Sequence, residues 1–175
     1  MKKNVHFLAR TAIVCALYAV MTLSFGVISY GPVQFRLSEL LLLLCFLDPR
    51  YILGVTLGCF FANLFGPYGI VDALFGSLHT LISTVFTALT PFIIKNRKIL
   101  SLIISSLWAS ILSFIIAFEM VFVFTSEESF WFWYFFVALG EFVVISVVGV
   151  PFYSVILKNQ RLCNALKFEA YKKNH

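Results

Sequence analysis

Long apolar runs alternate with short polar stretches along the whole chain. The runs cover, approximately, residues 5–27, 35–47, 51–65, 70–94, 99–124 and 131–157. A helix needs about 20 mainly apolar residues to cross the hydrocarbon core of a bilayer. Because the second and third runs are shorter, we expect them to borrow flanking residues or to lie beneath polar loops that dip into the bundle. The pattern predicts an all-α integral membrane protein with six transmembrane helices; two spans fewer is the alternative.

The composition leaves little of the chain for anything outside the membrane. Of its 175 residues, 61% are hydrophobic, and the mean hydropathy is +0.97. We therefore expect a single membrane domain over residues 1–175. The first run follows Lys2 and Lys3 as a signal peptide would, but it has full span length and no small-x-small cleavage site. It is expected to be the first transmembrane helix.

Basic residues collect on one side of this predicted bundle. Of the 13 Lys and Arg residues, all except Arg36 lie at the start of the first span, after the last, or in the loops after the second and fourth spans. Cytoplasmic loops of membrane proteins are enriched in Lys and Arg. We therefore expect an N-in/C-in topology with a cytoplasmic basic tail over residues 158–175. The net charge of +5 then reflects contact with anionic lipid, and no nucleic-acid partner is expected.

The chain carries no signature of catalysis, metal binding or ATP hydrolysis. It contains no HExxH or GxSxG motif, and we do not expect an enzyme. Three of its cysteines lie in apolar runs and Cys163 lies in the basic tail, without any CxxC pair, so neither a disulfide nor a metal site is expected. A Walker A motif is also missing from the sequence, so we do not expect the chain itself to hydrolyse ATP.

Small residues recur at four-residue spacing in the first and third runs. Ala12 and Ala16 form such a pair in the first, and Gly54, Gly58 and Ala62 form a series in the third. In lipid, helix association depends on close backbone approach, which small residues permit. We expect packing within the molecule for the third run, and also for a Ser/Ala stripe in the fifth. The first span is terminal, so its alanine face is free to contact another subunit.

Polar side chains gather at one depth of the predicted bundle, towards its outer side. The candidate binding residues at this depth are Gln34, Arg36, Glu39, Asn63, Asp72, His79, Glu119 and Glu141. Ionisable groups within spans are costly and mark binding or conduction paths. A channel or proton relay would also need such groups in the inner half, which we expect to be almost purely apolar. The pattern therefore predicts an outward-facing pocket that is closed at its inner end.

Several of these residues also have a simpler explanation. Arg36 and Glu39 are three positions apart and could pair with each other on one helix turn. His79 could be a hydrogen-bonded core histidine, and Asn63 could cap the end of its helix before the Gly-Pro turn that follows.

Two further acids and an aromatic segment complete the candidate site. Glu119 and Glu141 have no basic residue within a turn. Carboxylates at that depth need a cation or a hydrogen-bond donor as partner, and a ligand can supply one. Seven aromatic residues follow one another at 130–136. An interfacial aromatic belt is their simplest role, and Trp131 is the candidate among them for stacking on a planar ligand.

Three stretches of the chain resemble a known family. Residues 31–39 read GPVQFRLSE and resemble the GPxQFRxSE signature of the QueT family, which belongs to the S components of energy-coupling factor (ECF) transporters. The GxxxGCxxANL pattern over 54–64 and the GIVDxxFGSL pattern over 69–78 are also similar to that family. Together the resemblance covers spans one to four in order, about half of the chain, and the last two spans match only in character.

The resemblance implies a function and a set of partners. It implies a substrate-binding S component in a bacterial cytoplasmic membrane that takes up a queuosine precursor, with aminomethyl-deazaguanine as the leading candidate. A transmembrane coupling protein and two cytoplasmic ATPase subunits would be its partners. ATP would be used by those ATPases, and no cofactor is expected in this chain. Ala12 and Ala16 would form the contact surface for the coupling protein.

Such a ligand suits the predicted pocket chemically. One carboxylate can accept both the ring N–H and the exocyclic amino group of a guanine-type edge, and the aminomethyl cation needs a second carboxylate. Glu39 or Glu141 is the candidate for the ring edge, and Asp72 or Glu119 for the ammonium group. The alternatives are an S component for another vitamin or purine-like base, and a proton-coupled secondary transporter.

Overall fold

The computed structural model describes residues 2–168, and every regular element in this range is helical. Residues 169–175, which belong to the predicted basic tail, lie outside the described range. The α-helices are α1 (Lys2–Ser24), α2 (Gly26–Ser29), α3 (Leu44–Leu47), α4 (Tyr51–Leu64), α5 (Gly69–Ile93), α6 (Lys98–Leu112), α7 (Phe114–Phe118), α8 (Phe130–Glu141), α9 (Val150–Lys158) and α10 (Gln160–Leu166). A 3-10 helix, η1 (Leu37–Leu43), precedes α3, and two π-helical segments, η2 (Glu119–Val123) and η3 (Phe142–Gly149), continue α7 and α8.

Each apolar run of the sequence folds into helix, as expected. Four helical stretches are long and apolar enough to cross a membrane: Val5–Ser24, Gly69–Ile93, Lys98–Val123 and Phe130–Lys158. The second and third runs form shorter apolar helices, Leu37–Leu47 and Tyr51–Leu64. The all-α prediction is therefore confirmed, whereas the six-span count and the N-in/C-in orientation stay predictions.

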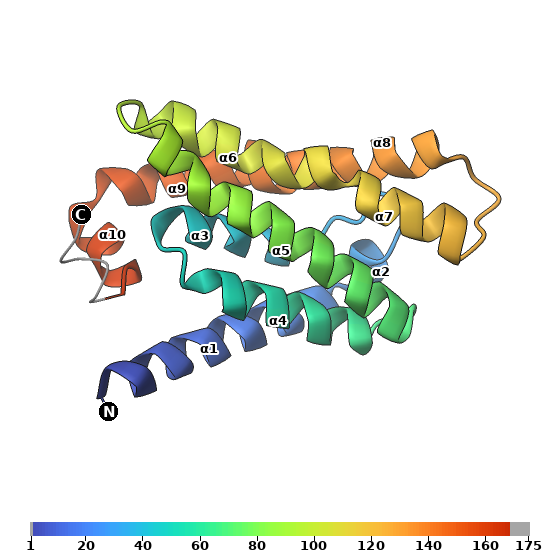
Figure 1. The fold of residues 1–175 in the computed structure, drawn as a ribbon, viewed down its shortest axis with the longest axis horizontal. Helices are drawn as coiled ribbons and strands as arrows, with labels where there is room; N and C mark the ends of the chain where they lie inside the picture. The colour runs from blue at the N-terminus through green and yellow to red at the C-terminus, as the bar shows by residue number, and fades with distance from the viewer. Residues whose placement is uncertain (1, 169–175) are drawn as a thin grey trace.

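The long helices run back and forth between two ends of the molecule, which lie at the left and right of Figure 1. The first end holds the start of α1, the loops 48–50 and 94–97, and α10; we call it the basic end (Figure 1). The second end holds residues 25–36, the turn 65–68 and the loop 124–129; we call it the opposite end (Figure 1).

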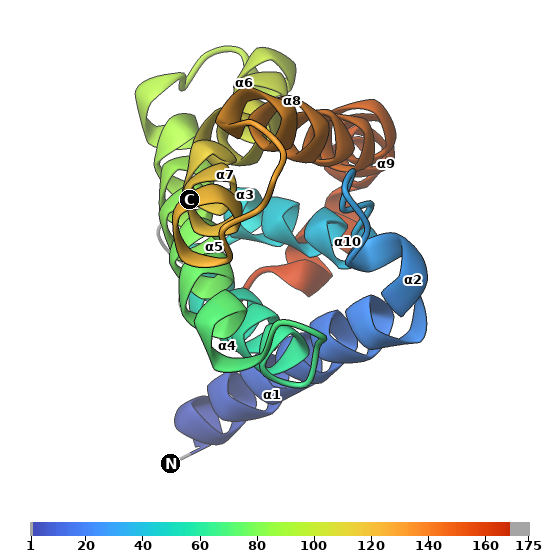
Figure 2. The same cartoon turned by 90° about the vertical axis from the view of Figure 1, so that its right-hand side faces the viewer.

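The second apolar run occupies the centre of the bundle. In the end-on view, η1 and α3 lie inside a ring formed by the longer helices (Figure 2), and η1 contacts α1, α4, α5, α6 and η3. Residues 42–47 are between 0% and 8% exposed. This segment is apolar all round because protein surrounds it on all sides. It lies beneath a buried polar loop, which is one of the two arrangements expected for it.

Small residues bring α4 close to α1. A Cβ atom on Gly58 would lie 2.6 Å from the Tyr18 Cβ, and one on Gly54 would lie 3.0 Å from the Thr11 carbonyl oxygen. The small-residue series of the third run therefore packs within the molecule, as expected. Ala12 and Ala16 lie on another face of α1, which is exposed.

The half of the bundle towards the basic end differs from the expectation of a purely apolar interior. There, helices α5 and α6 carry buried hydroxyl side chains, namely Ser83, Thr84, Thr87 and Thr90 on α5 and Ser101, Ser105 and Ser106 on α6. Thr87 Oγ1 donates to the Ser105 carbonyl oxygen at 3.1 Å, and Ser105 Oγ donates to the Thr87 carbonyl oxygen at 3.3 Å. Such hydroxyls hold membrane helices together without introducing charge.

The first part of the predicted basic tail folds back onto the bundle as α10. Arg10 Nη1 donates to the Lys167 carbonyl oxygen at 3.1 Å, and the Tyr51 hydroxyl donates to the Leu166 carbonyl oxygen at 2.5 Å. The backbone N–H of Phe168 donates to Asp48 Oδ2 at 2.9 Å. The sequence predicted only a basic tail for this segment and not its docking, because these contacts join residues more than a hundred positions apart.

Candidate functional site

The polar residues singled out in the sequence meet near the opposite end, inside the bundle. Eight of them are at most 4% exposed: Gln34, Arg36, Glu39, Asn63, Asp72, His79, Glu119 and Glu141. We call this group the polar cluster. Trp131 does not join it, since it is 72% exposed and contacts the rings of Phe130 and Tyr134 in the first turn of α8. That position fits the aromatic-belt alternative.

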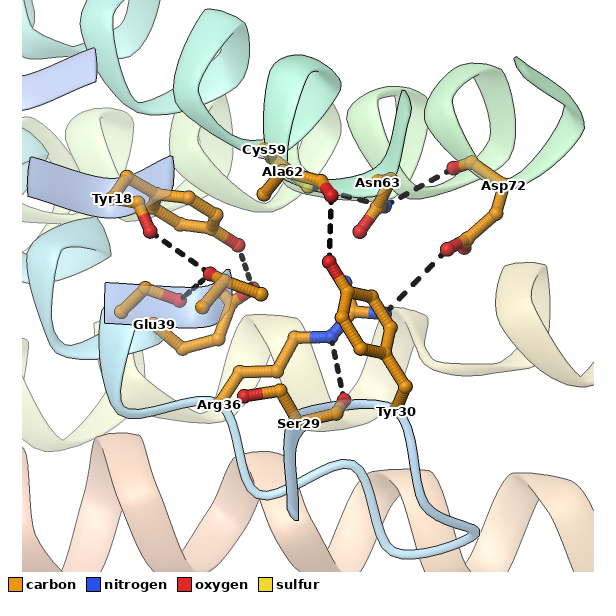
Figure 3. Close-up of polar contacts among 11 residues, drawn as sticks. Tyr18, Ser29, Tyr30, Arg36, Glu39, Cys59, Ala62, Asn63 and Asp72 are labelled. Carbon is orange, nitrogen blue, oxygen red and sulfur yellow. Dashed lines mark hydrogen bonds and ion pairs between the residues drawn. The ribbon is translucent and has the colours of Figure 1, made fainter. Parts of the chain in front are cut away.

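Arg36 enters the cluster from the loop that precedes η1. Its Nη2 atom lies 4.0 Å from Asp72 Oδ2, and its Nε donates to the Ser29 carbonyl oxygen at 3.2 Å (Figure 3). The guanidinium also lies over the Tyr30 ring, 5.4 Å from the centroid. A buried guanidinium is tolerated only when partners of this kind surround it. The loop is therefore held against the α4–α5 corner by its charge.

The suggested pairing of Arg36 with Glu39 is wrong. Arg36 has an extended backbone, with φ −97° and ψ 98°, and lies just before the first turn of η1. The two residues therefore do not share a helical face. Instead, the Tyr18 hydroxyl of α1 donates to Glu39 Oε1 (Figure 3). Glu39 Oε2 has no hydrogen-bond partner among the described residues.

Asn63 joins α4 to α5 rather than capping its own helix. Its Nδ2 atom donates to the Asp72 carbonyl oxygen at 3.1 Å (Figure 3). Gly76 makes room for this side chain, because a Cβ there would lie 2.1 Å from Asn63 Nδ2. Within the described part of the chain, Asn63 Oδ1 and both carboxyl oxygens of Asp72 accept no hydrogen bond.

Glu119 and Glu141 each lie where a helix changes to π-helical geometry. Glu119 is the first residue of η2, and Glu141 immediately precedes η3. Single π-helical turns are rare and frequently mark functional sites. Both carboxyl oxygens of Glu119, and Oε2 of Glu141, lack a hydrogen-bond partner among residues 2–168.

The cluster contains more acceptors than donors. The cluster holds one guanidinium, that of Arg36, and four carboxyl groups, those of Glu39, Asp72, Glu119 and Glu141. One guanidinium cannot neutralise or hydrogen-bond four buried acids, and unpartnered buried acceptors are expensive. The arrangement is therefore suited to a ligand that brings positive charge and several N–H donors.

The surroundings of His79 and Gln34 fit a role in holding the fold. His79 Nε2 donates to the Ala109 carbonyl oxygen at 3.0 Å, which links α5 to α6 and fits the alternative of a hydrogen-bonded core histidine. Gln34 has φ 47° in the loop before η1. That loop presses on α8, since a Cβ on Gly140 would lie 1.9 Å from the Val33 carbonyl oxygen. A substrate contact by either residue stays a prediction.

Tyr18 and Tyr30 belong to this site but were missed in the sequence. Tyr18 is fully buried and binds Glu39, and the Tyr30 hydroxyl donates to the Ala62 carbonyl oxygen at 2.6 Å (Figure 3). Tyrosines count as apolar in a hydropathy pattern. The sequence holds one signal for this part of the site: Tyr18 and Thr22 are four positions apart and therefore share one face of α1. In the structure, that face meets η1, because the Thr22 and Ser38 hydroxyls lie 2.6 Å apart.

The described residues contain no group of three or more His, Cys, Asp or Glu side chains that could hold a metal ion. The four cysteines are free thiols. The polar cluster consists of four carboxyl groups, one guanidinium, two amides and one imidazole.

Comparisons with known proteins agree with one another. The family model of the QueT transporter matches residues 8–158. The Queuosine precursor transporter QueT of Lactococcus lactis subsp. cremoris (strain MG1363) is 34% identical over 157 residues, which cover 83% of this chain and 89% of that protein. No solved structure matches the chain. With its several long apolar helices, this multi-pass membrane protein belongs to the QueT transporter family.

Proposed function

We propose that this chain is the substrate-binding S component of an ECF importer and that it captures a queuosine precursor from outside the cell. The observation that carries the proposal is the set of buried carboxyl oxygens without hydrogen-bond partners around Arg36 in the described chain. The relative from Lactococcus lactis, which is named a queuosine precursor transporter, supports the choice of substrate. Aminomethyl-deazaguanine is the precursor we propose.

The proposed ligand matches the cluster group by group. Glu119 has two unpartnered oxygens and, unlike Asp72, forms no ion pair within the described residues, so we assign it to the ammonium group of the aminomethyl arm. Glu39 or Glu141 accepts the ring N–H and the amino group, since each has an unpartnered Oε2. Arg36 Nη2, which makes no hydrogen bond within the described residues, donates to the ring carbonyl.

Equilibrium binding tests this assignment. The purified protein in detergent is titrated with guanine, the nitrile precursor and the aminomethyl precursor. We expect the tightest binding for the aminomethyl compound, because it alone carries a cation. Glu119→Gln should remove the preference for the aminomethyl compound over the nitrile while binding of the nitrile persists. Tight binding of a thiamin-like or folate-like compound instead would contradict the substrate assignment.

Delivery across the membrane requires partners in this proposal. We propose an N-in/C-in orientation in a bacterial cytoplasmic membrane, with a transmembrane coupling protein and two ATPase subunits that use ATP. The exposed face of α1 that carries Ala12 and Ala16 supports such a contact. It borders a groove of about 460 Å³, whose apolar lining includes Ile13 and Leu17. Close approach of a second helix is favoured where small residues interrupt an apolar face.

A double substitution separates capture from delivery. Changing Ala12 and Ala16 together to Leu should abolish uptake in cells and leave ligand binding unchanged, because both side chains are exposed, whereas Tyr18 of the same helix, which binds Glu39, is fully buried on another face. An equal loss of binding would contradict this division of roles. Uptake that follows the proton gradient and persists without ATPase subunits would favour a secondary transporter.

A further inference from the structure

A second site lies at the basic end, away from the polar cluster. A cavity of about 500 Å³ is present there between α3, α5, α6, α9 and α10. Half of its lining residues are apolar, and the polar ones are Lys95, Lys98, Ser101, Gln160, Cys163 and Lys167. The volume is in the range of sites that hold small molecules or head groups. Its mixed lining suits an amphiphilic ligand.

The charge of this cavity is positive. Lys95 and Lys98 are both exposed, and neither lies within ion-pair distance of a carboxylate of residues 2–168. The acid in the nearby loop, Asp48, is already engaged, because it accepts the backbone N–H groups of Arg50 at 3.0 Å and Phe168 at 2.9 Å. An anion that enters the cavity therefore finds two lysines available.

Two uncharged features add hydrogen-bond donors at the same place. Ser101 lines the cavity and is only 1% exposed, yet its hydroxyl has no hydrogen-bond partner in the described chain. Helix α6 begins at Lys98 without a side-chain cap on its first N–H groups. The N-terminus of a helix attracts anions, because its backbone N–H groups are free and its dipole is positive there.

We propose that this cavity binds a phosphate group at the membrane surface and that an anionic phospholipid supplies it. Lysines, a hydroxyl and helix N–H groups are the donors that phosphate oxygens accept from. The apolar part of the lining, which includes Pro91, Phe92 and Ile94, matches the glycerol and upper acyl region of a lipid. Basic pockets between helix ends at a membrane surface recognise such head groups.

Native mass spectrometry of the full chain in detergent tests the site. The protein is titrated with phosphatidylglycerol, phosphatidylcholine and soluble glycerol phosphate. Phosphatidylglycerol should bind most tightly, and the double variant K95Q/K98Q should bind it about 25-fold more weakly, at about fivefold for each lysine near a membrane surface. Ser101→Ala should weaken binding by a smaller factor. The matched control is Arg97→Gln, because Arg97 is exposed in the same loop but does not line the cavity.

Each outcome of this experiment decides something. A loss of lipid in R97Q as large as the roughly fivefold loss expected for each of the two lysines would overturn the site, since it would show only non-specific attraction. If phosphatidylcholine bound as tightly as phosphatidylglycerol, the assignment of an anionic head group to the cavity would be overturned. Competition by glycerol phosphate at the affinity of the lipid would support the phosphate site and overturn the lipid as its source. The unfolding temperature without lipid shows that the variants are folded.

Discussion

At the scale of single residues, the polar cluster is built around one guanidinium. Arg36 is 4% exposed, and its partner Asp72 is fully buried. When one member of a buried ion pair is removed, the other remains as an uncompensated charge, and this is far more costly than removing both. The pair therefore contributes to holding the loop before η1 against α5.

A double-mutant cycle tests whether the buried charges of Arg36 and Asp72 are coupled. Arg36→Gln alone should lower the free energy of unfolding in detergent by about 3–5 kcal/mol, since Asp72 is left unpaired in a buried place. The double variant R36Q/D72N should recover part of that loss. Chemical or thermal unfolding followed by circular dichroism measures both. Additive losses in the double variant would mean that the two charges are not coupled.

Residue identities predicted which polar groups would be buried, but not their partners. Acids and an arginine inside apolar runs are costly in a membrane, so their burial at one depth could be expected from the sequence. Arg36 and Asp72 belong to elements far apart in the chain, and no local spacing relates them. Glu39 pairs with Tyr18, which a hydropathy pattern counts as apolar. Local rules therefore favoured the wrong pair, Arg36 with Glu39.

At the scale of elements, α1 uses two faces for different purposes. One face packs against Gly54 and Gly58 of α4, and another carries Ala12 and Ala16 in an exposed position. Small residues at four-residue spacing occur on both α1 and α4, so the spacing alone does not tell an internal contact from an external one. Burial decides between them, and only the folded structure reveals it.

A matched pair of substitutions separates these two faces. Gly58→Leu should push α1 away from α4 and lower the unfolding temperature, because even a Cβ there would lie 2.6 Å from Tyr18 Cβ; overpacking of this kind costs about 1–3 kcal/mol or more. Ala16→Leu places the same side chain on the exposed face and should leave the unfolding temperature unchanged. Similar losses in both variants would contradict the assignment of the faces.

Helix positions followed directly from hydropathy, while helix types did not. The limits of the six apolar runs lie close to the ends of helical stretches because lipid and core both select apolar residues. The 3-10 geometry of η1 and the π-helical geometry of η2 and η3 depend on how side chains pack across the bundle. Glu119 and Glu141 stand at these irregular turns, which carried no signal in the sequence.

At the scale of the whole molecule, the two ends carry different chemistry. The opposite end encloses acids around one guanidinium, and the basic end carries lysines and a folded-back α10. Asp48 connects α10 to the bundle, because its carboxylate accepts backbone N–H groups from Arg50 and Phe168. A single buried side chain thus joins the segment after α9 to the loop before α4.

Asp48→Ala should release α10 from the basic end. Hydrogen bonds to a charged acceptor contribute about 1.5–3 kcal/mol each, and two are lost here. We expect faster tryptic cleavage at Arg161 and Lys167 than in the unsubstituted chain, with little change in ligand binding. Limited proteolysis followed by mass spectrometry measures this. Unchanged cleavage would mean that Arg10 and Tyr51 hold the segment without Asp48.

The enclosed position of η1 and α3 also bears on biogenesis. Leu37–Leu47 is a short apolar helix. At 1.5–2 Å per residue it is too short to cross the roughly 30 Å of a hydrocarbon core. If the translocon inserts segments one at a time, this segment is too short to be inserted by itself as a stable transmembrane helix. Its place depends on the helices that surround it, so insertion of the long helices and closure of the bundle around this segment are separate events.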